Sequence, residues 1–218
     1  MRLAHFLGAA LLAVAGCGPL NENSAAKGFV NVLKARVAGA SGAPAAAPAP
    51  VLTRAQADAN PGQFLLVTAY GGASVAALVP AGTNGNRVTW LSADSVAVTL
   101  ENGIIAATRG FPRDLMAAQL NGVRQAIAAG GGTATRIHET LTDTDQISQQ
   151  VLQCSIAPQG AELVQILGKS TPTRRIDEEC RNESLVFTNT YWVRADGAII
   201  KSRQVVAPGT GFVVLEHP

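Results

Sequence analysis

The pattern of hydrophobic and polar positions predicts short β-strands over most of the chain. From residue 63 onward, apolar runs and alternating positions, as over residues 96–100, are separated by Gly, Asn and Pro. The pair Asn102-Gly103 is typical of a two-residue hairpin turn. The charged segment 174–181 is ambiguous. Strands are expected over residues 64–70, 74–79 (ended by Pro80), 87–91, 96–100, 104–108, 136–142, 146–156, 162–167, 185–194, 198–206 and 211–215. Such a chain forms an antiparallel sheet that closes into a barrel or folds into a sandwich.

Only short helices are expected. Apolar residues at helical spacing predict a helix over residues 25–37. Thr53 is suited to cap a helical turn over residues 54–59, which Pro61 ends. A further helical turn is expected at residues 114–120, within an otherwise irregular stretch.

The first 17 residues predict export and lipidation. Arg2 supplies a positive charge, and residues 6–16 are apolar or small. This run is too short to span a bilayer, which needs roughly 20 residues, so residues 1–16 are interpreted as a signal peptide. The stretch from Val14 to Cys17 resembles the lipobox of bacterial lipoproteins, in which the cysteine is lipidated and the signal is cut before it. An ordinary signal peptide followed by a chance cysteine is the alternative.

Lipidation at Cys17 places the expected protein on the outer membrane. Acyl chains such as palmitate anchor a protein stably when two or more are attached. Gly18, in place of Asp, favours the outer membrane by the lipoprotein sorting pattern. We expect residues 17–50 to hold the lipidated cysteine, a tether, the short helix and an Ala/Pro-rich linker, and residues 51–218 to form the β-domain, facing the periplasm.

Export also bears on the other two cysteines. Cys154 and Cys180 reach an oxidising compartment, where a pair of thiols normally forms a disulfide. Closing the loop between them would contribute roughly 3 kcal/mol to stability. A metal pair and free thiols are the alternatives, but no His-rich or Cys-x-x-Cys pattern supports a metal. We expect no metal and no cofactor.

Composition narrows the classes of function. Hydrophobic residues make up 47% and charged residues 15%, which excludes a disordered chain. A net charge of +2 predicts no surface for nucleic acid. After the signal, the chain contains only two histidines, His138 on an expected strand and His217 at an end expected to be frayed. Without a Gly-x-Ser-x-Gly motif, one usable histidine cannot be paired with a nucleophile, so His138 is interpreted as a residue of the barrel wall or surface.

Carboxylate pairs could act on glycosides. The candidates are Asp94, Asp114, Asp143 and Asp145. Three of them, all except Asp114, lie in sequences typical of turns, so solvated turn residues are the favoured interpretation. We expect no catalytic residue.

Two groups of side chains form a candidate surface for a ligand or partner. Arg109 and Asp114 flank a Gly-Phe-Pro loop, where a structural ion pair is favoured over a binding role. Trp90, Tyr191 and Trp192 could stack on sugars. Because adjacent residues of a strand point to opposite faces, core packing is favoured for at least one of the last two.

An ordered set of motifs extends through residues 51–208. It comprises Trp-x-Ser-x-Asp at 90–94, Asn-Gly-Ile at 102–104, Thr-Arg-Gly at 108–110, the two cysteines, and Asn-x-Tyr-Trp at 189–192. This order resembles the YjbF/GfcB (YmcC-like) family of bacterial lipoproteins, which is associated with exopolysaccharide and group 4 capsule operons. The Ala/Pro linker at residues 38–50 departs from the family pattern. The resemblance implies a mainly β, barrel-like fold.

These observations lead to one main expectation and two alternatives. The chain is expected to be a lipid-anchored, non-enzymatic accessory in exopolysaccharide or capsule assembly or export, with polysaccharide-export proteins or the polysaccharide as partners. A periplasmic glycan-modifying enzyme would need a cleft with paired carboxylates or an ordered histidine. A lipid carrier would need a continuous apolar cavity, whereas a filled barrel favours a scaffold.

Overall fold

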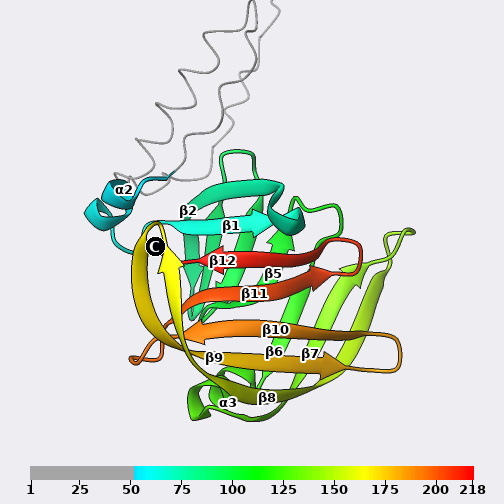
Figure 1. Cartoon of the computed structure of the whole chain (residues 1–218). Helices are drawn as coiled ribbons and strands as arrows, with labels where there is room; N and C mark the ends of the chain where they lie inside the picture. Colours follow the sequence, from blue (N-terminus) through cyan, green and yellow to red (C-terminus); the bar gives the residue numbers. More distant parts are fainter. Residues whose placement is uncertain (1–51) are drawn as a thin grey trace, which may run out of the picture. The chain divides into compact units, whose positions relative to one another are not determined.

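The computed structural model describes residues 52–218, which form a nearly closed antiparallel barrel (Figure 1). The strands are β1 (Leu65–Ala69), β2 (Ser74–Asn84), β3 (Arg87–Leu91), β4 (Ala97–Glu101), β5 (Ile104–Arg109), β6 (Ala117–Asn121), β7 (Gly132–Leu141), β8 (Ile147–Ile166), β9 (Lys169–Arg181), β10 (Val186–Val193), β11 (Ile199–Ala207) and β12 (Gly211–Glu216). The helices are α2 (Arg54–Ala59), a 3-10 turn η1 (Tyr70–Gly72) and α3 (Val123–Ala129). The predicted mainly β, barrel-like fold class is therefore confirmed.

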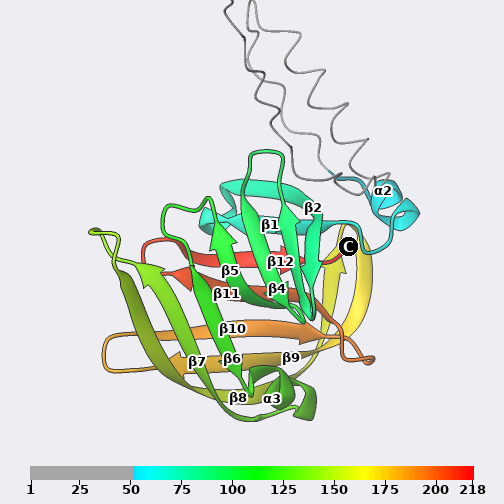
Figure 2. The same cartoon turned by 180° about the vertical axis from the view of Figure 1, so that it is seen from behind.

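The order of the strands follows the chain, with one long-range pairing between β1 and β12. The two ends of the sheet, β5 and β6, are neighbours in sequence and meet at a seam (Figure 2). There the backbone N–H of Thr108 donates to the carbonyl of Leu115 at 2.8 Å. The residues that join the two strands thus also help to close the barrel.

Gln204 of β11 reaches through the interior to the unpaired edge of β5. Its side-chain oxygen accepts from the N–H of Ile105 at 2.9 Å, and its nitrogen donates to the carbonyl of Gly103 at 3.1 Å. Gln204 is 1% exposed, so these backbone groups would otherwise be buried without partners. One inward side chain therefore satisfies two backbone groups at the start of the edge that the sheet leaves open.

Buried side chains fill the interior in two apolar clusters. The first packs strands β1 to β6 against β11 and β12, and contains Leu65, Val67, Leu78, Trp90, Val98, Leu100, Ile105, Leu115, Val206, Val213 and Leu215 among others. The second packs α3 against β7 to β11, and contains Val123, Ile127, Leu152, Ile156, Ile176, Phe187, Tyr191, Val193, Ile199 and Val205 among others. The barrel core is therefore made of side chains from every part of the sheet.

A third apolar cluster lies on the outer face of the sheet. Leu66 belongs to it, and alternates along β1 with the inward Leu65 and Val67. The tip of the β8–β9 hairpin covers this face beside α2 (Figure 1). There the guanidinium of Arg54 donates to the carbonyl of Leu167 at 3.3 Å.

The structure confirms the capped helical turn at residues 54–59. Thr53 accepts from the N–H of Gln56, and Gln56 returns a bond to the Thr53 backbone, which is a capping box. Among the described residues no helix is long and apolar enough to cross a membrane. The helix expected at residues 25–37 and the linker at 38–50 lie outside the described residues.

The helical turn expected at residues 114–120 is wrong. Strand β6 occupies Ala117–Asn121, and the helix α3 follows it. Val123, Ala126 and Ile127 are the buried residues of α3, at spacings of three and four, and glycines flank it on both sides. This spacing of apolar residues was the sequence signal from which α3 could have been predicted.

Two expectations about strand limits are also wrong, those at residues 146–167 and at Pro80. The two strands expected at 146–156 and 162–167 are one strand, β8, while the segment 174–181, which the sequence left ambiguous, belongs to β9. The register of β8 shifts between Pro158 and Gly160, so these residues form a bulge rather than a break. Pro80 lies inside β2, beyond the part that pairs with β1 and next to a register shift against β3, a kind of position where strands accept proline.

We expect Gln204→Leu to destabilise the protein by about 1–3 kcal/mol, because the N–H of Ile105 and the carbonyl of Gly103 lose their partner. Urea unfolding measures the change. Gln165→Leu is the matched control, because Gln165 is exposed on β8. Equal effects of the two substitutions would contradict the role given to Gln204.

Candidate functional site

A charged network occupies the barrel interior. Arg136 of β7 forms a two-point ion pair with Glu178 of β9, with Nε–Oε1 at 2.7 Å and Nη2–Oε2 at 2.9 Å. Arg136 Nη2 also donates to the hydroxyl of Tyr191 on β10 at 2.7 Å, and that hydroxyl donates to Glu178 Oε2 at 2.7 Å. These side chains are 0–2% exposed.

Asn189 extends the network to β11. Its amide nitrogen donates to Glu178 Oε2 at 2.8 Å, and its oxygen accepts from the N–H of Val205 at 2.9 Å. Burial by itself opposes the ionisation of Glu178. The charge and hydrogen bonds of Arg136, together with those of Asn189 and Tyr191, nevertheless hold the pKa of Glu178 below its ordinary value. The carboxylate is thus charged and fully bonded.

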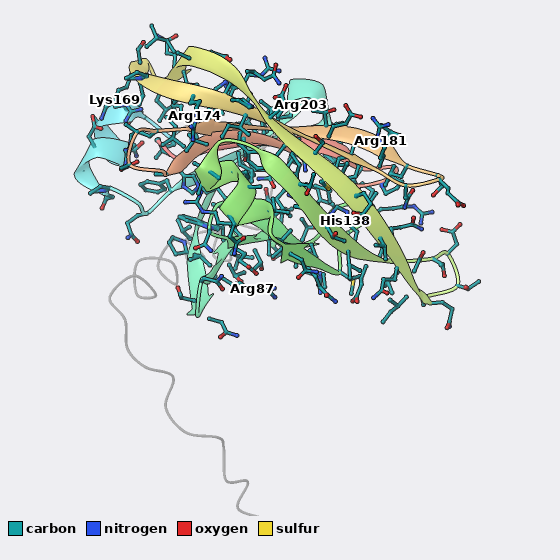
Figure 3. The ribbon with its side chains drawn as sticks, turned by 90° about the horizontal axis from the view of Figure 1, so that it is seen from below. Arg87, His138, Lys169, Arg174, Arg181 and Arg203 are labelled. Atoms are coloured by element: carbon teal, nitrogen blue, oxygen red, sulfur yellow. A yellow bond between two sulfur atoms is a disulfide. The ribbon has the colours of Figure 1, made fainter. Side chains whose placement is uncertain are left out.

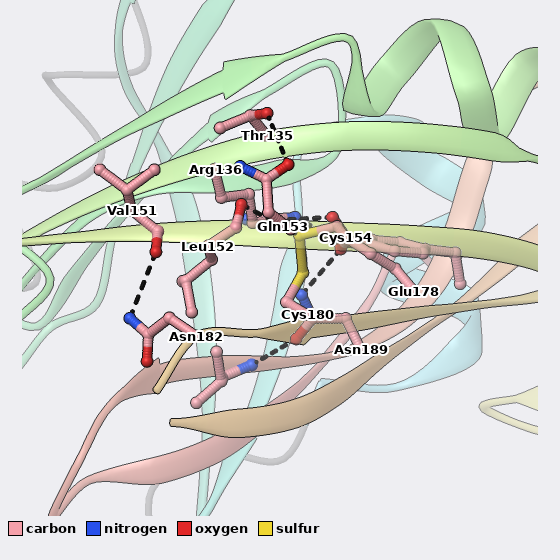
Figure 4. Close-up of a disulfide and its surroundings, with 12 residues drawn as sticks. Thr135, Arg136, Val151, Leu152, Gln153, Cys154, Glu178, Cys180, Asn182 and Asn189 are labelled. Carbon is pink, nitrogen blue, oxygen red and sulfur yellow. Dashed lines mark hydrogen bonds and ion pairs between the residues drawn. A yellow bond between two sulfur atoms is a disulfide. The ribbon is translucent and has the colours of Figure 1, made fainter. Parts of the chain in front are cut away.

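The predicted disulfide between Cys154 and Cys180 is confirmed, and it lies beside this network (Figure 4). The two residues face each other across β8 and β9. Their sulfur atoms lie close to the Glu178 carboxylate, a set of donors that could otherwise attract a metal. Because the thiols are joined to each other, they are not metal ligands.

His138 points into the barrel from β7 and is 4% exposed. Its ring stacks on Phe187 with centroids 5.8 Å apart. Burial, reinforced by the charge of Arg136 and opposed by that of Glu178, lowers the pKa of His138 to about 3. Nε2 is buried with no hydrogen-bond partner among the described residues. His138 is therefore a neutral, inward residue of the barrel wall.

The structure separates the three candidate aromatic residues. Trp90 and Tyr191 lie in the core at 6% and 0% exposure, so neither ring presents an open face to solvent. Trp192 lies on the outer face, packed against the third apolar cluster, with the Lys201 ammonium 5.5 Å from its ring centre. The three rings do not form one platform for a sugar.

The expected ion pair between Arg109 and Asp114 is absent from the described part of the chain. Asp114 instead accepts from the Thr108 hydroxyl at 2.8 Å and from two backbone N–H groups, of Gly110 and Phe111, at 3.0 and 3.2 Å. Arg109 donates to the Met116 carbonyl at 3.3 Å. Both side chains therefore bond the backbone of the loop between β5 and β6, and not each other.

The other titratable candidates occupy loops or the chain end. Asp94 lies in the β3–β4 turn, and Asp143 and Asp145 lie in the β7–β8 turn. His217 is not frayed, since its N–H donates to the Ile200 carbonyl at 2.8 Å and its ring meets Trp90 edge-on at 5.6 Å.

An open cleft of about 670 Å³ lies at the end of the barrel that carries α2. Four basic side chains and one acidic side chain, Asp58, line it. The basic residues are Arg54, Arg124, Lys169 and Arg194. Figure 3 shows Lys169 and the nearby Arg174 toward this end, away from His138.

Two of these cations are already paired with carboxylates. Arg54 pairs with Asp58 at 3.1 Å, and Arg194 pairs with Asp196. Arg124 donates through Nη2 to the Gly197 carbonyl at 2.9 Å, but its buried Nη1 has no partner among the described residues. With the exposed Lys169, this leaves a cationic surface suited to a carboxylate or phosphate group.

A family described as "Group 4 capsule polysaccharide lipoprotein gfcB, YjbF" matches residues 29–217 of the chain. The chain belongs to this family. Among solved structures it is similar to the hypothetical lipoprotein YmcC from Escherichia coli (K12), with a TM-score of 0.68. The two sequences are 21% identical over 86% of this chain and 93% of that chain, a likeness that shows the fold alone. A search of curated proteins found no match.

The motifs that resemble the YjbF family have structural roles here. Asn189 and Tyr191 point inward and bond Glu178, whereas Trp192 points to the outer face of the sheet and packs against the third apolar cluster. At the hairpin, Asn102 and Gly103 have φ of 51° and 86°, and a Cβ on Gly103 would lie 3.1 Å from the side chain of Ile199. The motifs therefore describe the interior and the turns of the barrel.

Sequence reasoning missed Arg136, Glu178 and Arg124. The available signal for the first two was a charged residue at an inward position of each alternating strand, beside His138 and Cys180 respectively. That alternation does not predict that Arg136 and Glu178 form an ion pair, because β7 and β9 are not neighbours in the sheet.

We expect Glu178→Met or Arg136→Met to destabilise the protein by roughly 3–5 kcal/mol, since each leaves one buried charge unpaired. The double variant should be more stable than either single variant, because it removes both charges. Urea unfolding of the four proteins measures this coupling. Additive losses would show that the pair is not energetically coupled.

Acid should destabilise the protein through His138. Its pKa is about 3 in the folded state against an ordinary 6.5, so the unfolded state binds more protons between these values. The free energy of unfolding should therefore fall as the pH drops from about 6.5 toward 3. The charges that bear on the ring are Arg136 of its own strand and Glu178 of β9, and Arg113 lines the same pocket.

His138→Gln should flatten this pH dependence, measured by urea unfolding between pH 7 and pH 4. His217→Gln is the control, because burial also lowers the pKa of His217 and its share of the pH dependence has to be measured separately. An unchanged slope in His138→Gln would contradict the assignment.

Proposed function

We propose that this chain is an outer-membrane lipoprotein, anchored through Cys17 and facing the periplasm, that acts as a non-enzymatic accessory in capsule or exopolysaccharide assembly or export. The observation that carries the proposal is the family match over residues 29–217. The family description names a capsule polysaccharide lipoprotein, and that role is transferred to this chain as a proposal.

The filled interior favours a scaffold over a lipid carrier. Two apolar clusters and the Arg136–Glu178 network occupy the space that an acyl chain would need. A carrier of the kind considered from the sequence would need that space to be continuous and apolar. Burial of a charged network there favours a fixed structure.

The chemistry of the described side chains favours binding over catalysis. His138 is buried, neutral and bonded to no carboxylate in the described part of the chain. Asp114 is occupied by the backbone of its own loop. General acid–base catalysis needs such groups within hydrogen-bond reach of a substrate.

The cationic cleft is the proposed contact for acidic groups. The polysaccharide could present carboxylates or phosphates to Arg124 and Lys169, and so could a protein of the export apparatus. Both partners share the anionic chemistry that the cleft selects. Binding there would hold the partner near the base of α2, where the described chain begins.

Deletion of the gene should lower secreted and surface polysaccharide, and the wild-type gene should restore it. Cys17→Ala, which cannot be lipidated, should fail to restore it at equal protein abundance. The measurement is the amount and chain length of polysaccharide in each strain. Unchanged polysaccharide in the deletion strain would overturn the proposed role.

The cleft is tested in the same strains. Arg124→Gln combined with Lys169→Gln should reduce polysaccharide, because the cleft loses the two cations that pair with no carboxylate of residues 52–218. The control is Arg87→Gln combined with Arg181→Gln, which removes two exposed cations that pair with Glu101 and Glu179 and do not line the cleft (Figure 3). Equal export by the two double variants would exclude the cleft as the contact.

A further inference from the structure

A second pocket lies at the opposite end of the barrel from the cationic cleft. Its volume is about 340 Å³, within the range of small-molecule sites. It is lined by residues of β7 and β8 near their shared turn and by the β9–β10 and β11–β12 turns. These turns gather at one end because the turns of an antiparallel sheet alternate between its two ends (Figure 1).

Four polar side chains form a compact array on the wall of this pocket. His138 faces Gln150 across β7 and β8, and Thr140 faces Ser148 two positions further along. All four line the pocket. Facing side chains on paired strands have Cβ atoms about 4.5–5.5 Å apart, so the four groups can contact one small molecule together.

The hydrogen-bonding capacity of this array is largely unused. Within the described part of the chain, Nε2 of His138 is buried without a partner. The Thr140 and Ser148 hydroxyls form no hydrogen bond with described residues, and Gln150 uses only its oxygen, which accepts from Asn182 at 2.8 Å. Buried polar groups in folded proteins are normally bonded, so an unpartnered imidazole nitrogen in a pocket is suited to a ligand.

The array carries no net charge. Burial keeps His138 neutral, and Thr140, Ser148 and Gln150 do not ionise in this range. Arg113, which also lines the pocket, is paired with Asp143. Four apolar residues also line the pocket, namely Leu141, Leu185, Ala207 and Pro208. Neutral hydroxyl and amide groups together with apolar residues match a sugar ring, which has hydroxyls at its edge and C–H groups on its faces.

We propose that this pocket binds one uncharged pyranose unit of a glycan, with His138, Thr140, Ser148 and Gln150 bonding its hydroxyls. The proposal rests on the proposed role in polysaccharide export and gives that role a specific site. It also gives the two ends of the barrel different tasks. The cationic cleft selects acidic groups, and this pocket selects a neutral sugar.

The test is an NMR titration of the full chain, purified in detergent and labelled with ¹⁵N-histidine. The probes are the methyl glycosides of glucose, galactose, mannose and N-acetylglucosamine, with methyl glucuronide as the charged comparison. At least one neutral glycoside should shift the His138 ring resonance saturably, with a Kd in the millimolar range. His217 should not shift, which makes it an internal control.

Variants assign the shift to the array. His138→Phe retains a ring against Phe187 but removes Nε2, and should weaken binding at least tenfold in a saturation-transfer experiment. Thr140→Val and Ser148→Ala should each weaken it severalfold and cover the case in which His138→Phe fails to fold. Thr135→Val is the matched control, because Thr135 lies on β7 but does not line the pocket.

The proposal is overturned if no neutral glycoside shifts His138 saturably, if the glucuronide binds more tightly, or if the array variants bind as the wild type does. Its failure is distinguishable from failure of the proposed function. Loss of polysaccharide on deletion, without glycoside binding, removes only this site. Glycoside binding in a protein whose deletion leaves polysaccharide unchanged removes only the export role.

Discussion

The ion pair between Arg136 and Glu178 is the constraint on which the barrel interior depends. Two charges at 0–2% exposure are costly to remove from water, and they are tolerated because they bond each other at two points and both bond Tyr191. The two charges and the side chains that bond them come from β7, β9 and β10. A slip of one residue in any of these strands would turn an inward side chain outward and leave a buried charge unbonded. The network therefore fixes the register of one wall of the barrel.

Closure of the barrel depends on a different kind of interaction. Apolar packing brings β5 toward β11, but it does not satisfy the backbone groups along the unpaired edge of β5. Gln204 bonds two of these groups from inside, while Asp114 and Arg109 bond the backbone of the β5–β6 connection. The edge strands β5 and β6 thus meet without a full ladder, and the barrel interior is still filled by apolar side chains. With the interior filled, the cationic cleft and the neutral pocket lie at opposite ends of the barrel.

The sequence predicted the regular parts of the fold because those depend on local pattern. Alternation and the Asn102-Gly103 turn located most strands, and Thr53 located a helix start. The errors arose where distant contacts overrule local signals. Pro158 interrupts no strand, because a bulge absorbs it, and residues 114–120 are not helical, because pairing with β7 draws β6 into the sheet. The candidate sites depended still more on distant contacts, since neither the burial of Trp90 nor the partner of Arg136 is encoded in nearby residues.

The same distinction explains what the family motifs mean. In Asn-x-Tyr-Trp, Asn189 and Tyr191 are two positions apart and both bond Glu178, whereas Trp192 packs on the outer face. The motif thus places two inward side chains of one strand against a buried carboxylate, so it specifies the architecture of the barrel. The cationic cleft and the neutral pocket are instead built from side chains at strand ends and turns, such as Lys169 and Ser148. The shared motifs therefore identify the barrel, whereas the residues of the cleft and the pocket lie outside those motifs except for Asn102 and Gly103.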